Sequence, residues 1–389
     1  MTLGLRHVAR ARAAGRGRAR RWHNRAVSAS VTALLPLYLR ERRAGRALVL
    51  GLLLHTQGST YQKPGALMLF AAEGEYAGLF SGGCLEGDLR EHAEAVRRSG
   101  EPRTVRYDLR DPDDLIWGLG LGCEGLMQIL LLRVGPENAW EPLHCLAQAH
   151  QARTGAAVGV VYASASASTP TGSLLLPAAC GAGLRGEALQ RHLQAAQGSA
   201  QTQLVRESAA DGSYELCILP LALPPRVLLL GAGPDALPVV ELAARLGWEV
   251  TLADHRAAYA VPSRFPGAHT LLLPPGTELE RILPLEDFAA AVVMSHHLAA
   301  DAAYLRALAG TRIPYVGLLG PPARRDKLLA ELGPDAQALR GRLHAPVGLP
   351  LGGRSPEAIA LSIIAELQAF LCHRSGIGYA RAPPATVQR

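Results

Sequence analysis

Residues 227–236 read Val-Leu-Leu-Leu-Gly-Ala-Gly-Pro-Asp-Ala, and this stretch decides the fold of the C-terminal half of the chain. A short apolar run, typical of a buried strand, leads into Gly231 and Gly233, and an apolar helical pattern follows. An acid, Asp254, stands 23 residues after Gly231, where a second strand is predicted to end. This order is typical of the first strand–helix–strand unit of a dinucleotide-binding domain. It predicts a Rossmann-like, doubly wound parallel sheet.

Each residue of that unit has an expected part in cofactor binding. Gly231 permits the tight turn, Gly233 lets a phosphate approach the backbone, and Asp254 meets a ribose hydroxyl. Two residues count against a bound ligand, because Pro234 has no N–H and Asp235 puts a carboxylate beside the expected pyrophosphate. Fold and ligand are therefore separate predictions. Binding of NAD(P) is one hypothesis, and glycines that serve only the strand–helix turn are the other.

Working outward, the periodicity divides the chain into parts. A helical pattern over 26–45 is interrupted at Pro36, and a last helix is predicted to begin with Ser355 as its N-cap and Pro356 in its first turn. Strands are predicted at 47–54, 66–70, 76–80, 126–134, 156–162, near 174 and 216, and at 227–230, 249–253, 270–273, 290–294 and 313–318. In chain order we expect a basic disordered tail (1–25), an α/β domain (26–135), a less regular middle region with a Pro-rich linker (136–225), a Rossmann-like domain (226–372) and a tail (373–389).

The positive charge of the chain is concentrated at its N-terminus. The formal net charge is +7, and residues 1–25 hold eight Arg and no acid, which leaves 7 − 8 = −1 for the other 364 residues. A nearly neutral body disfavours nucleic-acid binding, although the pI is near 9.3. The tail resembles a transit peptide, and a disordered arm or a mis-assigned start codon are the alternatives.

The apolar runs and the cysteines exclude further classes. The longest apolar run, 47–54, is far shorter than the ~20 residues of a membrane helix, and the tail has no apolar core of a secretory signal. Six Cys occur without a Cys-x-x-Cys pair, which argues against a zinc ribbon and against a disulfide scaffold. We therefore expect a cytoplasmic protein in a reducing compartment, with no membrane partner.

A second constellation reads Ser81-Gly82-Gly83-Cys84-Leu85-Glu86 and precedes a predicted helix. Its two glycines allow backbone conformations that other residues avoid. Cys84 falls in the first turn of the helix, where unpaired N–H groups lower the pKa of a thiol. Such a thiolate could ligate a soft metal or pass on sulfur. A buried Cys at a tight turn is the equal alternative.

Two further loops are rich in glycine. The segment 118–125 holds four glycines around Cys123, among them Gly122, and suits close approach to a large ligand. The segment 55–65 includes Gly58, Ser59 and Thr60, whose amides and hydroxyls suit a phosphate or a pterin-type oxyanion. Each loop taken alone could be an ordinary connection between strands.

Read together, these segments resemble the XdhC/CoxI family of molybdenum-enzyme accessory factors. The matching motifs run in one order along the chain and cover about 45–135 and 225–370: Gly58-Ser59-Thr60 with Pro64-Gly65, Ser81 to Glu86, the loop at 122–125, Gly231-Ala-Gly233, Asp254 and Arg256, Arg264-Phe-Pro266, 315–320, 344–349 and 356–363. The resemblance implies an N-terminal α/β domain of XdhC/CoxI type followed by the Rossmann-like domain.

The resemblance also implies a function. A member of this family would bind molybdenum cofactor (molybdopterin), support its sulfuration and support its insertion into a xanthine-dehydrogenase-like hydroxylase. It would act as a chaperone with no small-molecule turnover, and its partners would be that client, a cysteine desulfurase and a second copy of the chain. In that setting Ser81, Gly82, Gly83, Glu86 and the other loop residues bind the cofactor. Thiolates of Cys84 and Cys123 are the expected metal ligands.

Three departures from the family pattern concern the Rossmann-like domain and one loop. Pro234 follows Gly-Ala-Gly where His is common, His296-His297 stand where His-Asp is common, and Glu124 stands where Gly is usual. None of them touches Cys84. An NAD(P)-dependent oxidoreductase is the alternative function, and a scaffold that links a sulfur donor to its client is a third.

Overall fold

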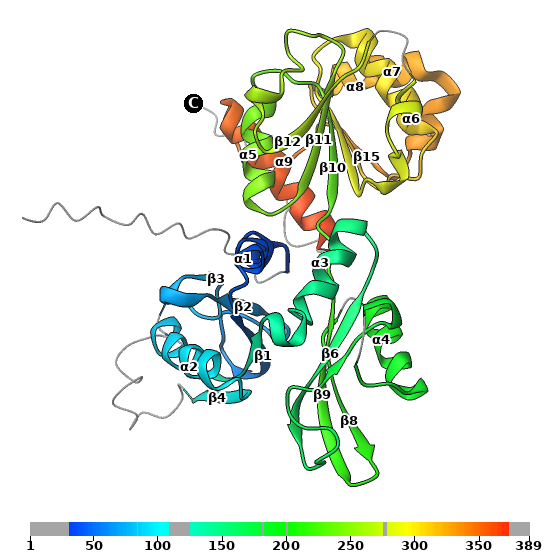
Figure 1. Ribbon diagram of the computed structural model, residues 1–389. Helices are drawn as coiled ribbons and strands as arrows, with labels where there is room; N and C mark the ends of the chain where they lie inside the picture. Colours follow the sequence, from blue (N-terminus) through cyan, green and yellow to red (C-terminus); the bar gives the residue numbers. More distant parts are fainter. Residues whose placement is uncertain are drawn as a thin grey trace, which may run out of the picture.

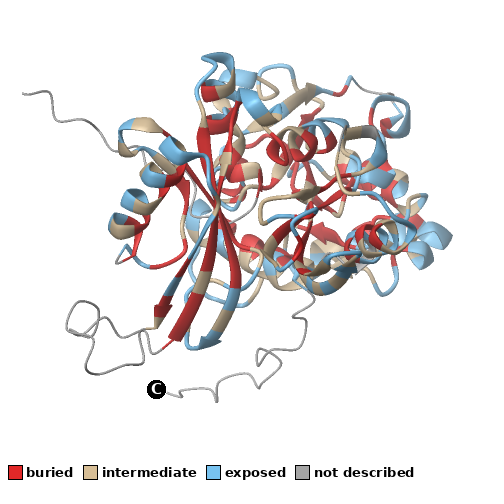
Figure 2. Cartoon of the chain, turned by 60° about the horizontal axis from the view of Figure 1, so that its bottom comes forward, coloured by how far each residue is buried: buried red, intermediate tan, exposed pale blue. Residues whose placement is uncertain are grey.

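The computed structural model describes residues 31–83, 85–108, 125–180, 183–199, 201–274 and 278–372. Within them the chain forms a five-stranded, a four-stranded and a six-stranded sheet, each with its own helices (Figure 1). In Figure 1 the six-stranded sheet lies at the top, and the other two lie side by side below it. Buried residues gather along the strands and on the helix faces packed against them (Figure 2).

The N-terminal sheet is antiparallel throughout and has the order β3-β2-β1-β5-β4. Its strands are β1 (Leu48–Gly58), β2 (Leu67–Phe70), β3 (Tyr76–Gly78), β4 (Arg103–Asp108) and β5 (Gly125–Val134). Alternate residues of β1 face opposite sides, since Leu50 and Leu52 pack on one cluster with α1 (Val31–Arg43) and Val49 and Leu53 on another with α2 (Glu86–Ser99). Burial on both faces explains the unbroken apolar run at the start of β1.

Helix α1 passes through Pro36 without the predicted interruption. Proline removes one helical hydrogen bond and costs roughly 3 kcal/mol in a helix interior. Leu34, Leu37 and Tyr38 on either side of it are buried against the N-terminal sheet and α3 (Leu143–Ala152). The packing of this face outweighs the local cost, so the expected break was wrong.

The middle of the chain forms a regular four-stranded antiparallel sheet of order β7-β6-β9-β8. Its elements are α3 (Leu143–Ala152), β6 (Ala157–Ser164), β7 (Leu174–Leu175), α4 (Glu187–Ser199), β8 (Gln203–Ala209) and β9 (Gly212–Pro220). Neither helix was predicted, and nor was β8, an edge strand that alternates half-buried and exposed positions with no apolar run. The region is therefore more regular than its composition indicates.

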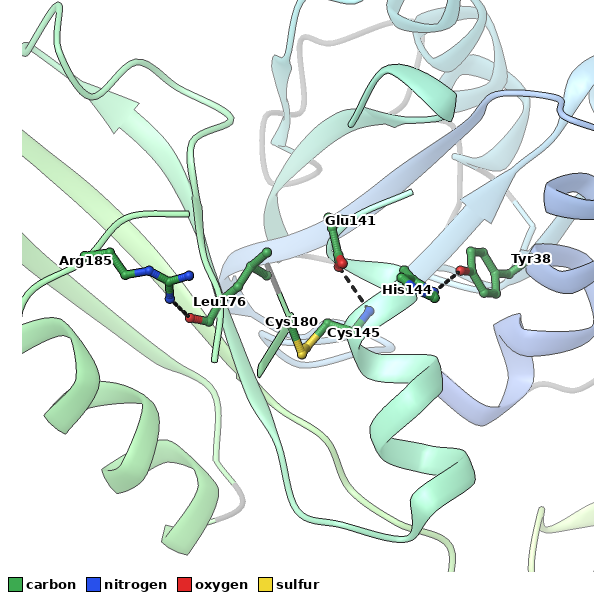
Figure 3. The surroundings of a disulfide bond; sticks show 7 residues. All are labelled: Tyr38, Glu141, His144, Cys145, Leu176, Cys180 and Arg185. Atoms are coloured by element: carbon green, nitrogen blue, oxygen red, sulfur yellow. Dashed lines mark hydrogen bonds between the residues drawn. A yellow bond between two sulfur atoms is a disulfide. The ribbon is translucent and has the colours of Figure 1, made fainter. Parts of the chain in front are cut away.

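A disulfide bond joins Cys145 of α3 to Cys180, with 5.4 Å between the two Cα atoms (Figure 3). The cysteine spacing argues against a disulfide scaffold and does not predict this bond, because the fold brings together positions 35 residues apart. Beside it, Glu141 accepts a hydrogen bond from the N–H of Cys145 at 3.0 Å. Among the described residues Cys217 and Cys372 are free thiols, and burial raises the pKa of Cys217 to about 12.

The C-terminal sheet is parallel throughout, with the order β12-β11-β10-β13-β14-β15. Its strands are β10 (Arg226–Leu230), β11 (Glu249–Asp254), β12 (Ala268–Leu272), β13 (Ala290–Val293), β14 (Val316–Leu318) and β15 (Leu343–His344). Helices α5 (Ala236–Arg245) and α9 (Pro356–Leu371) cover one face, and α6 (Leu279–Ile282), α7 (Leu298–Ala309) and α8 (Pro322–Leu332) cover the other. This strand order is that of a Rossmann fold, so the predicted doubly wound sheet is confirmed.

The predicted start of the last helix is also confirmed. Ser355 is the N-cap of α9, and its Oγ accepts a hydrogen bond from the N–H of Ala358 at 3.3 Å. Pro356 occupies the first helical position, where its missing N–H costs nothing. In the described part of the chain, helices are too short or too polar to cross a membrane.

Candidate functional site

The antiparallel register of the N-terminal sheet brings two of the predicted loops, and the last residue of the third, to one end. Strands β1, β3 and β4 run in one direction and finish at this end, while β2 and β5 begin there. Gly58 at the end of β1 pairs with Gly125 at the start of β5, and Asp108 of β4 pairs with Leu126. The segments 59–66 and 79–85 therefore leave from the same edge, and β4 ends and β5 begins at that edge. We call this edge the loop end of the N-terminal sheet.

A buried carboxylate holds the loop 81–85 in place. Glu86 accepts the N–H of Ser81 at 2.8 Å and its hydroxyl at 2.6 Å, and the N–H of Phe80 lies 3.3 Å away. Ser81 Oγ in turn accepts the N–H groups of Gly83 and Leu85, at 3.3 and 3.2 Å. Glu86 and Ser81 are only 3% and 2% exposed. Two predicted site residues thus position the loop from beneath and do not face solvent.

The two glycines of this loop do face solvent. Gly82 and Gly83 are exposed, and a Cβ on either would meet no atom within 4 Å. Gly83 has φ +113°, in the region that favours glycine. Bare backbone is therefore presented to an approaching ligand. Cys84, the next residue, lies outside the described residues.

The loop after β1 lies against the start of β5. A Cβ on Gly125 would sit 2.4 Å from the carbonyl oxygen of Ser59 and 2.6 Å from Cγ2 of Thr60, so only glycine permits this approach. Gly58 has φ +74°, and both Gly58 and Ser59 are exposed. Gly122 and Cys123 lie outside the described residues. The structure thus brings Gly58, Ser59 and Thr60 of the predicted 55–65 loop to Gly125, the last residue of the predicted 118–125 loop.

One pair at the loop end does not follow from the sequence patterns. Tyr107 of β4 donates a hydrogen bond to Asp88, in the first turn of α2, at 2.5 Å. Burial raises the pKa of Tyr107, and the Asp88 carboxylate raises it further. The pair fixes the end of β4 against the helix that begins after the Ser81 loop. Val105 and Tyr107 alternate with polar neighbours, and this period of two was the signal for the unpredicted strand.

The described residues at the loop end carry groups that can interact with an anion. Exposed glycine backbone, Ser59 and the exposed Lys63 offer hydrogen bonds and positive charge to an anion. Among the described residues, however, no three His, Cys, Asp or Glu side chains are placed to hold a metal ion. Cys84 and Cys123, the thiolate ligands expected from the sequence, lie outside the described residues.

The glycine turn of the Rossmann domain is built as the sequence predicts at Gly231. This residue has φ +134°, and a Cβ on it would lie 2.4 Å from the carbonyl oxygen of Met294 on the neighbouring strand connection. Its N–H donates to the carbonyl of Ala253 at 2.8 Å. At Gly233 a Cβ would lie 2.4 Å from Oδ1 of Asp235. The space above this glycine is thus taken by a side chain of the same loop.

Asp254 differs from its expected arrangement. It is fully buried, and its carboxylate accepts the N–H of Ala232 at 2.7 Å and both the N–H and the guanidinium of Arg256 at 2.7–2.9 Å. Burial alone would raise the pKa of Asp254, but these hydrogen bonds, led by Arg256, hold it below its usual range. Both oxygens are engaged within the chain, so the carboxylate is not presented to a ribose hydroxyl.

Two family models match the chain. The model described as the XdhC Rossmann domain matches residues 227–367, which is the six-stranded part. The model described as the XdhC and CoxI family matches residues 41–108, which includes β1 to β4 and the Ser81 loop.

Similar proteins cover most of the chain. A probable xanthine dehydrogenase subunit of Bacillus subtilis (strain 168) is 33% identical over 326 residues, which are 82% of this chain and 92% of that protein. "Molybdenum cofactor insertion chaperone PaoD" of Escherichia coli (strain K12) is 24% identical over 85% of this chain and 86% of its own length. A crystal structure from Bacillus halodurans, described as a xanthine dehydrogenase, superposes with a TM-score of 0.72 at 28% identity over 90% of this chain and 98% of that one. On this evidence the chain belongs to the XdhC and CoxI family.

Proposed function

We propose that this protein binds molybdenum cofactor at the loop end of the N-terminal sheet and supports its sulfuration and insertion into a molybdenum hydroxylase. The observation that carries the proposal is the common edge at which the loops 59–66 and 79–85 leave the sheet, β4 ends and β5 begins. Both loops present exposed glycine or serine backbone there. The names of the relatives, a cofactor insertion chaperone and a xanthine dehydrogenase component, support the same reading.

In this proposal the residues of the chain divide into ligands and supports. Gly82, Gly83 and Ser59 offer backbone groups to the anionic part of the cofactor. Cys84 and Cys123 hold the metal, because thiolates are the protein ligands that suit a soft centre. The cofactor supplies that metal centre, which the client enzyme later uses. The role of Glu86 is to keep the Ser81 loop in one conformation before the ligand arrives, which lowers the ordering cost of binding.

Several finer expectations belong to the same proposal. The client is a xanthine-dehydrogenase-like hydroxylase, a cysteine desulfurase supplies sulfur, and the protein works as a cytoplasmic homodimer. It passes on a cofactor and turns over no small-molecule substrate. Each of these partners predicts a complex that can be isolated with the purified chain.

The cysteine ligands give the proposal a direct test. Molybdenum cofactor released from a molybdenum enzyme is titrated without oxygen into the parent and into Cys84→Ser and Cys123→Ser, with tryptophan fluorescence as the signal. A serine hydroxyl replaces a soft thiolate poorly, so each variant is expected to bind at least about tenfold more weakly.

The matched control is Cys372→Ser, because Cys372 is a free, exposed thiol at the end of α9. It should bind as the parent does. Equal affinities of the parent and the Cys84 and Cys123 variants would contradict the assignment of the metal ligands. No binding by the folded parent would contradict the proposed function itself.

A further inference from the structure

Two loops of the Rossmann domain are joined across the crevice in which this fold places dinucleotides. Asp235 ends the glycine turn after β10, and His296 follows β13, the strand on the other side of the point where the strand order reverses. His296 Nε2 and Asp235 Oδ2 lie 2.7 Å apart. Ligands of open parallel sheets bind at this reversal, outside the carboxyl ends of the strands. We call this hydrogen-bonded pair the clasp.

The carboxylate of the clasp lies where a pyrophosphate would approach. Its Oδ1 would be only 2.4 Å from a Cβ on Gly233, on the side of the glycine that a phosphate uses in a dinucleotide fold. The imidazole of His296 also covers this glycine, since its Cδ2 would be 3.8 Å from the same Cβ. Asp235 is one-sixth exposed, at 16%, whereas His296 is 59% exposed. The carboxylate of Asp235 is thus largely buried, and the imidazole of His296 lies on its solvent side.

The turn also retains few donors for an external phosphate. The N–H of Gly231 bonds Ala253, that of Ala232 bonds the buried Asp254, and that of Ala236 bonds the carbonyl of Gly233 at 3.0 Å. Pro234 has no N–H. Four of the six positions from 231 to 236 therefore offer no free donor, where a phosphate site needs several converging ones.

The conformation of His296 is imposed by its surroundings. It has φ +61°, in the left-handed region that non-glycine residues rarely adopt. Ser295, just before it, donates its hydroxyl at 2.5 Å to Asp301, a fully buried carboxylate that also pairs with Arg324 at 2.6 Å. A non-glycine residue in this conformation motivates a functional hypothesis for its side chain. Here the conformation points the imidazole back toward Asp235.

From these contacts we infer that the clasp blocks the position where the pyrophosphate of a dinucleotide would bind, because the Asp235 carboxylate occupies the place of a ligand phosphate. The residues present do not fit NAD(P). The Rossmann domain of this chain therefore excludes dinucleotides and nucleoside diphosphates, and Asp235 and His296 are the residues that determine this. The inference does not depend on the cofactor site of the N-terminal sheet.

Calorimetry with ADP and with NADH tests the inference. The parent is expected to give no binding up to millimolar concentrations of either compound. The double variant Asp235→Ala/His296→Gly removes the carboxylate and its cover, and glycine keeps the φ of position 296. Because a ligand phosphate no longer meets the Asp235 carboxylate, the double variant is expected to bind ADP with a measurable affinity, at least about tenfold tighter than the millimolar limit set for the parent.

Two further variants keep the result interpretable. Asp235→Asn retains the shape of the side chain and is expected to bind ADP more tightly than the parent, so the test does not rest on the double variant alone. Asp326→Asn removes an exposed carboxylate on α8 that pairs with Arg325, and it should behave as the parent does. Sub-millimolar binding of NADH or ADP by the parent would overturn the inference. So would folded clasp variants that bind no more tightly than Asp326→Asn.

Discussion

Replacing Glu86 with alanine is expected to destabilise the N-terminal part by roughly 3–5 kcal/mol, because it leaves buried donors without their acceptor. Glu86 accepts the N–H and the hydroxyl of Ser81 and faces the N–H of Phe80. All three donors belong to Phe80 and Ser81, which are buried. The free energy of unfolding from urea titration measures the loss, and cofactor affinity should fall with it.

Two variants separate this effect from a general weakening of α2. Glu86→Gln keeps one acceptor oxygen and is expected to lose less stability than Glu86→Ala. Glu91→Ala removes an exposed carboxylate on the same helix, so it should unfold at nearly the urea concentration of the parent. Equal unfolding midpoints for Glu86→Ala and Glu91→Ala would contradict the role given to Glu86.

Replacing Gly231 with alanine is expected to cost roughly 3 kcal/mol or more and to unfold the Rossmann part first. A Cβ there would lie 2.4 Å from the carbonyl oxygen of Met294 and 2.6 Å from the N–H nitrogen of Ser295. Both obstacles are backbone atoms of the adjoining strand connection, so they cannot move aside as a side chain would. The φ of +134° adds strain to the clash.

Gly247→Ala is the matched control for that substitution. Gly247 follows α5 with φ +78°, also in the glycine-favoured region, but a Cβ on it would meet no atom within 4 Å. Only the conformational cost remains, about 1 kcal/mol. Thermal unfolding of both variants gives the comparison. If Gly231→Ala lowers the thermal unfolding midpoint no more than Gly247→Ala does, the contact between β10 and the connection after β13 is not tight.

The Rossmann domain could be predicted because its signals are local. The apolar run of β10 leads directly into a glycine turn, and the cap at Ser355 is read from neighbouring residues. Helix α1 could not be predicted correctly from Pro36, because its stability comes from buried contacts with elements far along the chain. Edge strand β8 could not be predicted from an apolar run, because alternate residues of this strand face solvent.

The candidate site shows the same division between local and distant signals. The Ser81 loop was visible from its glycines, but the position of Glu86 beneath it depends on how α2 packs on the sheet. Asp254 accepts a hydrogen bond from Ala232, 22 residues away, and Asp235 contacts His296, 61 residues away. Only the folded sheet therefore reveals that both carboxylates are engaged. The bond between Cys145 and Cys180 is hidden in the same way.

The metal and pterin content of protein purified without oxygen from a molybdate-replete host tests the central claim most directly. The parent is compared with Cys84→Ser, and each preparation is checked for folding by its thermal unfolding midpoint. The account predicts molybdenum and pterin in the parent and their loss from Cys84→Ser. Absence of both from the folded parent, or equal amounts in the two proteins, would contradict a cofactor site built on the loop end of the N-terminal sheet.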